Sequence, residues 1–212
     1  DTADPICTAA SLFDLGTYTV IAMTEPELFR RLLDRFARKL LPRTEAVAKA
    51  LPGRLWRIYG PEYASEPYLP PKLFREYVCG YVHPMIKSIQ RYGGFARIHS
   101  HGNLLGILDD IQKMAPDGLD PIEPPPQGDV ELKYVRERYG ETMVLFGNLE
   151  VSDIENLSSA AFAETVKRSV EEGTIGCGRG FVLMPSACPY GRELTGTAMR
   201  NYETMIEVIE RL

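Results

Sequence analysis

Short apolar segments alternate with longer amphipathic segments along the chain, and this alternation restricts the fold more than any other feature of the sequence. We predict six strands, each followed by a helix, with no β-hairpin between them. Repeated strand–helix units imply an α/β protein with parallel strands joined by right-handed crossovers. The strands are expected at residues 5–10, 54–59, 95–99, 118–122, 142–146 and 181–184.

The longest helix is expected at residues 25–51, with Thr24 as its N-cap and Pro26 in its first turn. Pro42 lies inside this helix and is expected to kink or divide it. His83, in the middle of the next helix, is expected to be structural. The later helices are expected at residues 72–92, 104–114, 159–172 and 196–212, with one more helix capped by Asp129.

Two parallel architectures fit this pattern, an open doubly wound sheet and a closed (β/α)8 TIM-type barrel. A complete barrel needs eight units and typically about 250 residues, so six units in 212 residues are too few to close one. Either the sheet is open, or the chain lacks an N-terminal portion of the barrel. No G-x-G-x-x-G fingerprint follows any strand, so no nucleotide cofactor is expected.

Composition argues against several classes of function. The net charge is -5 and no basic stripe is visible, so nucleic-acid binding is not expected. No apolar run reaches the roughly 18 residues of a membrane span, and no secretion leader is visible, so no membrane association is expected. None of the four cysteines forms a C-x-x-C pair, which favours reduced thiols in a cytoplasmic protein.

Polar residues follow the predicted strands at the end where parallel α/β proteins gather their chemistry. His99 and His101 are the sharpest pair, because side chains two residues apart in an extended segment point to the same face. Two imidazoles on one face can chelate a metal ion. The alternative is a pair of histidines that bond to neighbouring backbone groups or to substrate, and the sequence leaves both interpretations open.

Further polar candidates lie at other strand ends. Cys188 could complete a His, His, Cys zinc site with one open position, or be a small apolar loop residue. Glu62 and Glu123 could be general acids or bases, or partners of a metal-bound imidazole, rather than solvated charges. Solvation is less expected for Glu123, because the nearby prolines fix its backbone. Asn148 is expected to orient a ligand or loop, and Asn103 leads into a helix start that could bind an anion.

The same segments resemble proteins of the uroporphyrinogen decarboxylase superfamily. Residues 98–103, Ile-His-Ser-His-Gly-Asn, are similar to its H-x-C-G-N or H-x-H-G-N stretch, and residues 145–149, Leu-Phe-Gly-Asn-Leu, to its GN(I/L) strand end. Residues 118–129 resemble its strand and proline loop. Residues 59–74 resemble its segment ending in SP-x-x-F-x-E-(F/Y)-V, and residues 184–205 its closing strand and Asn-containing helix. The resemblance covers nearly the whole chain.

The resemblance implies a (β/α)8 TIM barrel that is longer than this chain. Residues 1–212 are therefore expected to form a single domain, the C-terminal part of such a barrel, with about six of the eight units. The remaining strands would precede Asp1. A partial barrel exposes strand edges and an apolar face, so we expect a preceding segment or a partner chain, such as a second copy in a homodimer, to cover the gap.

One branch of the resembled superfamily transfers methyl groups between a corrinoid protein and a thiol, and binds zinc through a His, a Cys two residues later and a distant Cys. The matching positions here are His99, His101 and Cys188. The first hypothesis is therefore zinc-assisted methyl transfer between a corrinoid or methylated small molecule and a thiol. Glu62 and Glu123 would be the catalytic groups.

The alternative hypothesis is a metal-free uroporphyrinogen decarboxylase, a carboxy-lyase of porphyrin biosynthesis that acts on a tetrapyrrole. That branch lacks His-x-His at the third strand and has Gly-His-Gly where this chain has residues 186–188, and both departures count against it. A third hypothesis is a non-catalytic binding module for a corrinoid protein. Substrate contacts are expected from Tyr63, Asn103, Asn148 and Tyr18, the last of which is loosely placed like the decarboxylase tyrosine.

Overall fold

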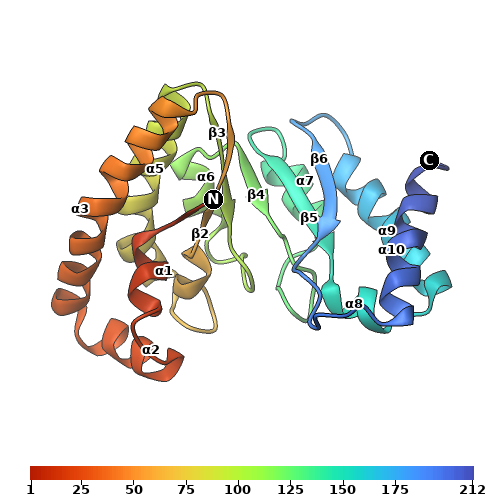
Figure 1. Cartoon of the computed structure of the whole chain (residues 1–212), viewed down its shortest axis with the longest axis horizontal. Helices are drawn as coiled ribbons and strands as arrows, with labels where there is room; N and C mark the ends of the chain where they lie inside the picture. Colours follow the sequence, from red (N-terminus) through yellow and green to blue (C-terminus); the bar gives the residue numbers. More distant parts are fainter. The chain divides into compact units, whose positions relative to one another are not determined.

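Six strands, each followed by helical segments, make up the chain, as the alternating pattern predicts (Figure 1). The computed structural model describes all 212 residues. They form two compact units, Asp1–Leu119 and Asp120–Leu212, with β4 (Gly118–Asp120) at the boundary. Within each unit the paired strands are parallel and follow chain order. Parallel strand–helix units of this kind are the components of a (β/α) barrel, which closes with eight.

The first unit contains three neighbouring parallel strands: β1 (Thr2–Ala3), β2 (Leu55–Tyr59) and β3 (Phe95–His99). Ala3 pairs with Tyr59, and Tyr59 pairs with His99, so the three strands end in register. Along β2 and β3, buried residues alternate with half-buried or exposed ones. Side chains two residues apart share a face, so Tyr59 and His99 lie on the less buried face of the strands. The prediction of a strand at residues 95–99 is confirmed.

The predicted strand at residues 5–10 is wrong, because Pro5–Ala10 forms the helix α1. Asp4 caps this helix: its Oδ1 accepts a hydrogen bond from the backbone N–H of Cys7 at 2.8 Å. A proline occupies the first turn, where its missing N–H has no helical partner to lose. A second helix that was not predicted, α2 (Leu15–Thr24), begins after Asp14, which caps it in the same way.

The long helix α3 (Pro26–Ala50) packs against α1 and begins within one residue of its predicted start. The prediction that Thr24 caps it is wrong: Thr24 is the last residue of α2, and Glu25 is the N-cap. The helix continues through Pro42, so this proline does not divide it, and the alternative of a kink stays a prediction. Pro42 and Arg38 are both exposed, and the Arg38 carbonyl that loses its helical partner can bond to water instead. The buried face of the helix carries Phe29, whose ring lies 4.9 Å from that of Tyr77.

The helix predicted at residues 72–92 is a continuous run of three segments: α4 (Pro71–Phe74), the π-helical η2 (Arg75–Cys79) and α5 (Gly80–Arg91). His83 Nδ1 lies 3.1 Å from the carbonyl oxygen of Met114, which joins α5 to α6 (Leu108–Met114). The structural role predicted for His83 is therefore confirmed. Helix α6 begins later than predicted, because the chain turns through residues 104–107 first.

The second unit contains the parallel strands β5 (Val144–Leu149) and β6 (Phe181–Pro185), with Asn148 opposite Met184. Strand β5 runs past its predicted end at residue 146, so Asn148 lies inside the strand rather than after it. This difference matters for the site, because Asn148 is thereby fixed by the sheet and not by a loop.

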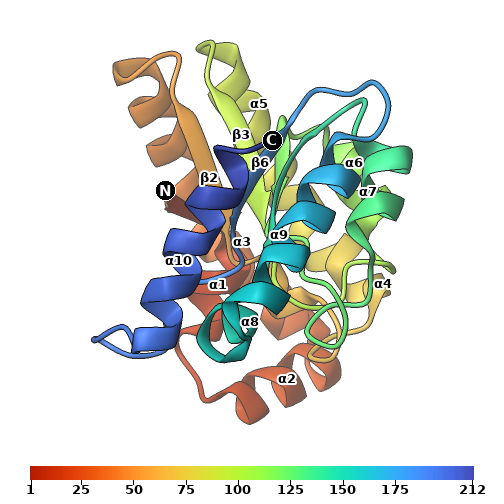
Figure 2. The same cartoon turned by 90° about the vertical axis from the view of Figure 1, so that its right-hand side faces the viewer.

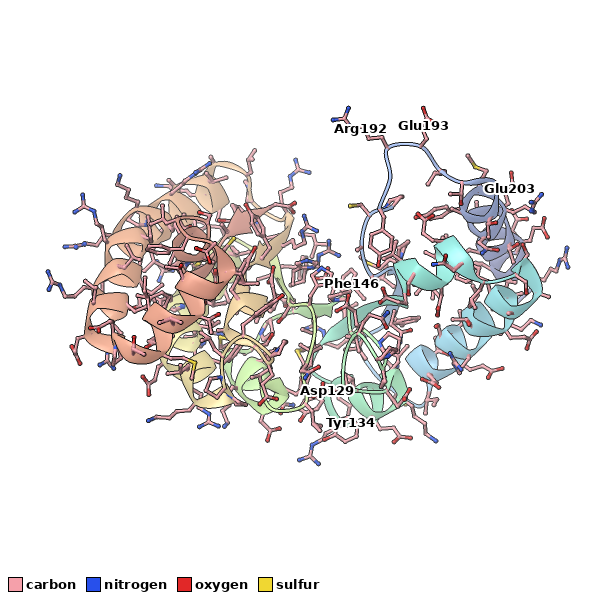
Figure 3. The ribbon with its side chains drawn as sticks, turned by 90° about the horizontal axis from the view of Figure 1, so that it is seen from below. Asp129, Tyr134, Phe146, Arg192, Glu193 and Glu203 are labelled. Atoms are coloured by element: carbon pink, nitrogen blue, oxygen red, sulfur yellow. The ribbon has the colours of Figure 1, made fainter.

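Helix α7 (Leu132–Tyr139) precedes β5, and its N-cap is Glu131. The prediction that Asp129 caps this helix is wrong. Val130 is buried, so the chain first places this side chain in the core and only then begins the helix. Figure 3 shows Asp129 on the loop ahead of Tyr134, which belongs to the helix.

Three helices pack against β5: α8 (Val151–Asn156), which was not predicted, α9 (Ser159–Thr174) and α10 (Gly196–Ile209). Figure 2 shows these helices next to one another. Their core with the strand consists of Leu149, Ile154, Phe162, Val166, Ala198 and Val208. Buried Asn201 donates to the carbonyls of Ile154 and Leu157, which ties α10 to α8. Since Leu149 faces these helices, Asn148 and Glu150 lie on the opposite face. None of the helices combines the length and apolarity that crossing a lipid bilayer would require.

Candidate functional site

His99 and His101 lie side by side at the carboxyl end of β3. Their ring centroids are 4.6 Å apart and the ring planes meet at 90°, edge to face. The side chain between them, Ser100, is fully buried, whereas both imidazoles are half-buried. The two-residue spacing therefore places the rings together on one side of the chain, as the sequence suggests.

The two rings contact each other edge to face, with 4.6 Å between their centroids, and each imidazole has nitrogen atoms of the kind that bind a metal ion. Within neither unit do three His, Cys, Asp or Glu side chains converge on a metal position. A metal held here needs at least one further ligand from outside the pair.

Cys188, the predicted third ligand, belongs to the second unit and lies on the loop that follows β6. Its thiol is exposed. Figure 3 shows this loop, with Arg192 and Glu193 at its tip. The histidines belong to the first unit, so joint ligation by all three residues stays a prediction.

The turn that carries Glu62 contacts the histidine segment. This turn is the short 3-10 helix η1 (Pro61–Ala64), and Ser65 directly after it donates from Oγ to the carbonyl oxygen of Glu62 at 2.9 Å; the carbonyl oxygen of His101 lies 3.4 Å from the same Oγ. Glu62 Oε2 accepts the backbone N–H of Gly60 at 2.9 Å, which fixes the carboxylate beside the end of β2. The structure thus brings Glu62 and the histidine pair to the same edge of the first unit.

Asp4 is a candidate functional residue that the sequence reasoning missed. It is fully buried at the end of β1; its Oδ1 accepts from Cys7, whereas its Oδ2 has no hydrogen-bond partner. A Cβ on Gly60 would overlap both Asp4 Oδ1 and the Cys7 side chain, so the turn before Glu62 packs directly on this carboxyl. Asp4 and Glu62 are therefore two neighbouring acids, one of them shielded from water.

Burial raises the pKa of Asp4 well above its ordinary value, the Cys7 N–H lowers it in part, and the charge of Glu62 raises it further. Burial, with Asp4 and Glu62, also raises the pKa of the Cys7 thiol to about 12. Cys7 is therefore a protonated thiol at neutral pH and a poor nucleophile. The Asp-Pro pair was the signal for this site, and it was hidden by the assignment of residues 5–10 to a strand.

Tyr18 is fully buried, and its hydroxyl donates to the carbonyl oxygen of Tyr63 at 2.9 Å. The two rings also meet edge to face, with centroids 6.2 Å apart. Tyr18 thus positions half-buried Tyr63, and its own contact with a substrate would require this packing to open. Asn103 is half-buried and borders a pocket of about 440 Å³ together with Met23 and Tyr68.

Two buried glutamates, Glu123 and Glu150, lie near the strand ends of the second unit. Glu150 Oε2 accepts from Ser186 Oγ at 3.0 Å, and Ser186 Oγ accepts the backbone N–H of Val151 at 3.2 Å. Burial raises the pKa of Glu150, the Ser186 hydrogen bond lowers it, and the charge of Glu123 raises it again. Glu150 was not among the predicted site residues, because its depth of burial depends on tertiary packing.

Glu123 is only 8% exposed, so the alternative of a solvated surface charge is wrong for this residue. The loop closes tightly on it, because a Cβ on Gly128 would overlap the Glu123 carbonyl. Asn148 is also buried, and its Oδ1 has no hydrogen-bond partner. Asn148 and Glu150 are two residues apart in an extended segment and share a face. The unpartnered Oδ1 of Asn148 therefore lies on the same face as the Glu150 carboxyl, whose pKa is raised.

Replacing Ser186 with alanine should lower the free energy of unfolding by about 1–2 kcal/mol, because two buried groups, Val151 N–H and the Glu150 carboxyl, lose their partner. The same change should raise the pKa of Glu150, since Ser186 lowers it. Urea unfolding at pH 7 and an NMR titration measure the two effects. Ser11→Ala removes one exposed hydrogen bond and should cost less than about 0.5 kcal/mol. Equal stability of the two variants would contradict this account.

A protein-family model described as uroporphyrinogen decarboxylase (URO-D) matches residues 3–212. The match extends over both compact units and includes every candidate site residue named above. A search of the curated proteins finds no match. The family resemblance carried by the sequence motifs is therefore confirmed.

Proposed function

Because the chain belongs to the uroporphyrinogen decarboxylase family, we propose that it is an enzyme that transfers a methyl group from a corrinoid or methylated small molecule to a thiol at a zinc centre. The observation that supports this proposal is the edge-to-face pair of His99 and His101 at the end of β3. When bound there, zinc supplies a positive charge that lowers the pKa of a thiol substrate and favours its thiolate.

The protein's own residues would hold the reactants and move one proton. In the transfer, a carbon–sulfur bond forms, the bond between the methyl group and its donor breaks with its electron pair left on the donor, and the thiol loses its proton. Glu62 is the proposed acceptor of that proton. The Gly60 N–H orients its carboxylate, and the Ser65 hydroxyl, which closes the turn on the Glu62 carbonyl, contacts the carbonyl oxygen of His101 at 3.4 Å.

The remaining candidates take supporting roles in this proposal. Cys188, with its exposed thiol, is the proposed third zinc ligand. Asn103 and Tyr63 are the proposed substrate contacts in the first unit, because both are half-buried and Asn103 borders a pocket. Glu123 is proposed as a second acid and Asn148 as a substrate acceptor contact, through its unpartnered Oδ1.

The alternative, decarboxylation of a porphyrinogen, has less support. Two departures from that branch count against it: the His-x-His at the end of β3 and Ser-Ala-Cys at residues 186–188, where that branch has Gly-His-Gly.

Zinc binding tests the proposal directly. Full-length protein should bind zinc, and His99→Ala or His101→Ala should each weaken its affinity at least tenfold, measured by competition with a chromogenic chelator. His83→Ala is the matched control, because this histidine bonds to a backbone carbonyl and should leave zinc affinity unchanged. Methyl transfer from methylcobalamin to a simple alkyl thiol, followed by the corrinoid absorbance, should fall with zinc affinity.

Two results would overturn the proposal. One is zinc affinity that is the same in the wild type and in both histidine variants. The other is conversion of uroporphyrinogen to a product with fewer carboxylates at a rate that neither histidine variant changes, which would establish the decarboxylase instead.

A further inference from the structure

Helix α3 carries an unusually basic surface for an acidic protein. The chain has a net charge of -5, yet this one helix contains seven basic and only three acidic side chains. Some of these basic side chains form ion pairs with neighbouring acids: Arg30 pairs with Glu27 and lies 3.6 Å from Glu76. The remainder lie mostly on the outer side of the helix, which Figure 1 shows at the edge of the first unit, beside α5.

A groove runs between α3 and α5, with a volume of about 930 Å³. Its lining includes Leu28, Leu32 and Leu41 from α3 and Tyr81 from α5. Leu28 is 55% exposed, so this apolar lining is open to solvent. Asp34, the one acid in the groove, accepts a hydrogen bond from the Tyr81 hydroxyl at 2.8 Å and is thus held by the groove itself.

Three arginines line the same groove: Arg31, Arg35 and Arg38. Their spacing of i, i+4 and i+7 puts them in one row along α3. All three are exposed, and none has an ion pair in the structure. An apolar groove bordered by unpaired arginines fits a helix that carries apolar side chains and a row of acids.

Helix α10 has this complementary surface. Glu203 and Glu207 on α10, and Glu210 at its C-cap, are exposed and follow the same i, i+4 and i+7 spacing as the three arginines; Glu207 also lies 3.5 Å from exposed Arg211. Met199 and Ile206, on this helix, are 49% and 55% exposed, so large apolar side chains accompany the acids. Figure 3 shows Glu203 on the outer side of α10. Apolar residues this exposed on a helix are typical of an interaction surface.

We propose that α10 of one copy docks into the α3–α5 groove of a second copy, with the glutamate row facing the arginine row. The matched spacing of opposite charges, each row accompanied by exposed apolar side chains, favours a second copy over an unrelated partner. Such a contact joins different surfaces of the two copies, so it can extend into a ring or a short chain. This association depends neither on the zinc site nor on the proposed reaction.

Concentration-dependent association tests the proposal. Sedimentation velocity of the chain between about 5 and 200 μM should show the average mass rising with concentration, and 0.5 M NaCl should reduce it by screening the paired rows. Arg35→Glu and Glu203→Lys should each weaken association at least tenfold. Lys39→Glu, an equal charge reversal on α3 outside the groove, is the control and should associate like the wild type.

Mixing the variants gives the sharpest result. An equimolar mixture of Arg35→Glu and Glu203→Lys should associate although each variant alone does not, because the unchanged α10 of the first fits the unchanged groove of the second and the two altered surfaces carry exchanged charges that attract each other. The double variant should recover association through the exchanged charges. All these positions are exposed, and circular dichroism checks that each variant is folded. A chain that stays monomeric at 200 μM, or a mixture that behaves like its separate components, would overturn the proposal.

Discussion

Gly60→Ala is expected to lower the free energy of unfolding by at least about 3 kcal/mol, a large loss for one added methyl group. Gly60 has a φ of 120°, which side chains with a Cβ rarely adopt. The added Cβ would also overlap Asp4 Oδ1 and Cys7 Cβ. Neither neighbour can yield freely, because the Asp4 carboxyl is held by the Cys7 N–H and is fully buried. Urea unfolding at pH 7, followed by circular dichroism, measures the loss.

Two other glycines separate the causes of this effect. Gly53 has a φ of 71°, but nothing lies within 4 Å of an added Cβ, so Gly53→Ala should cost only the backbone strain, about 1 kcal/mol. Gly80 lies in a helical run with open space around it, so Gly80→Ala should stabilise the protein by up to about 1 kcal/mol. If Gly60→Ala cost no more than Gly53→Ala, the close packing of the turn on Asp4 would be disproved.

The histidine pair could be predicted from the sequence because its geometry is local. An extended segment has a period of two, so His99 and His101 share a face wherever the strand lies. The strand itself was predictable, since residues 95–99 are bounded by a Gly-Gly turn and a Gly-Asn turn. Their ring separation of 4.6 Å follows from backbone geometry and does not depend on distant contacts.

Asp4 could not be recognised in the same way. Residues 5–10 form a short apolar run, and such a run fits a buried strand or a buried helix equally well. The preceding strand has only two residues, too few to show a period. Asp4 followed by Pro5 is a typical helix N-terminus, and this pair favours a helix over a strand. The unpartnered Oδ2, however, follows from tertiary packing by the Gly60 turn, which no local pattern records.

The second unit likewise contains features that local sequence patterns predict and features that depend on tertiary packing. The strand at residues 181–184 and the helix from residue 159 were predicted from apolar periodicity, and the structure confirms both. The Glu150–Ser186 bond joins residues 36 positions apart, which sequence periodicity does not connect. Asn148 was expected after a strand that ends at residue 146, whereas β5 continues through it to Leu149.

Asp4→Asn is expected to stabilise the protein by a few kcal/mol at pH 8, because it removes the cost of ionising a fully buried carboxyl whose Oδ2 has no partner. Asparagine is an equally good N-cap, and its Oδ1 can still accept the Cys7 N–H. Asp4→Ala is the matched control. It also removes the buried charge but loses the cap, so it should be about 1 kcal/mol less stable than Asp4→Asn at every pH.

The pH dependence identifies the cause of this stabilisation. The folded-state pKa of Asp4 is raised above the unfolded value near 3.8, so the native state binds its proton more tightly. This contribution to stability is complete below the unfolded pKa and is lost as pH rises through the folded pKa. The advantage of Asp4→Asn should therefore be close to zero at pH 3.5 and grow with rising pH until the folded carboxyl is ionised. Glu62→Gln should reduce the advantage, since the charge of Glu62 raises the same pKa. Urea unfolding from pH 3.5 to 9 measures the curve, and an advantage that stays constant over this range would show that Asp4 is not a strained buried acid.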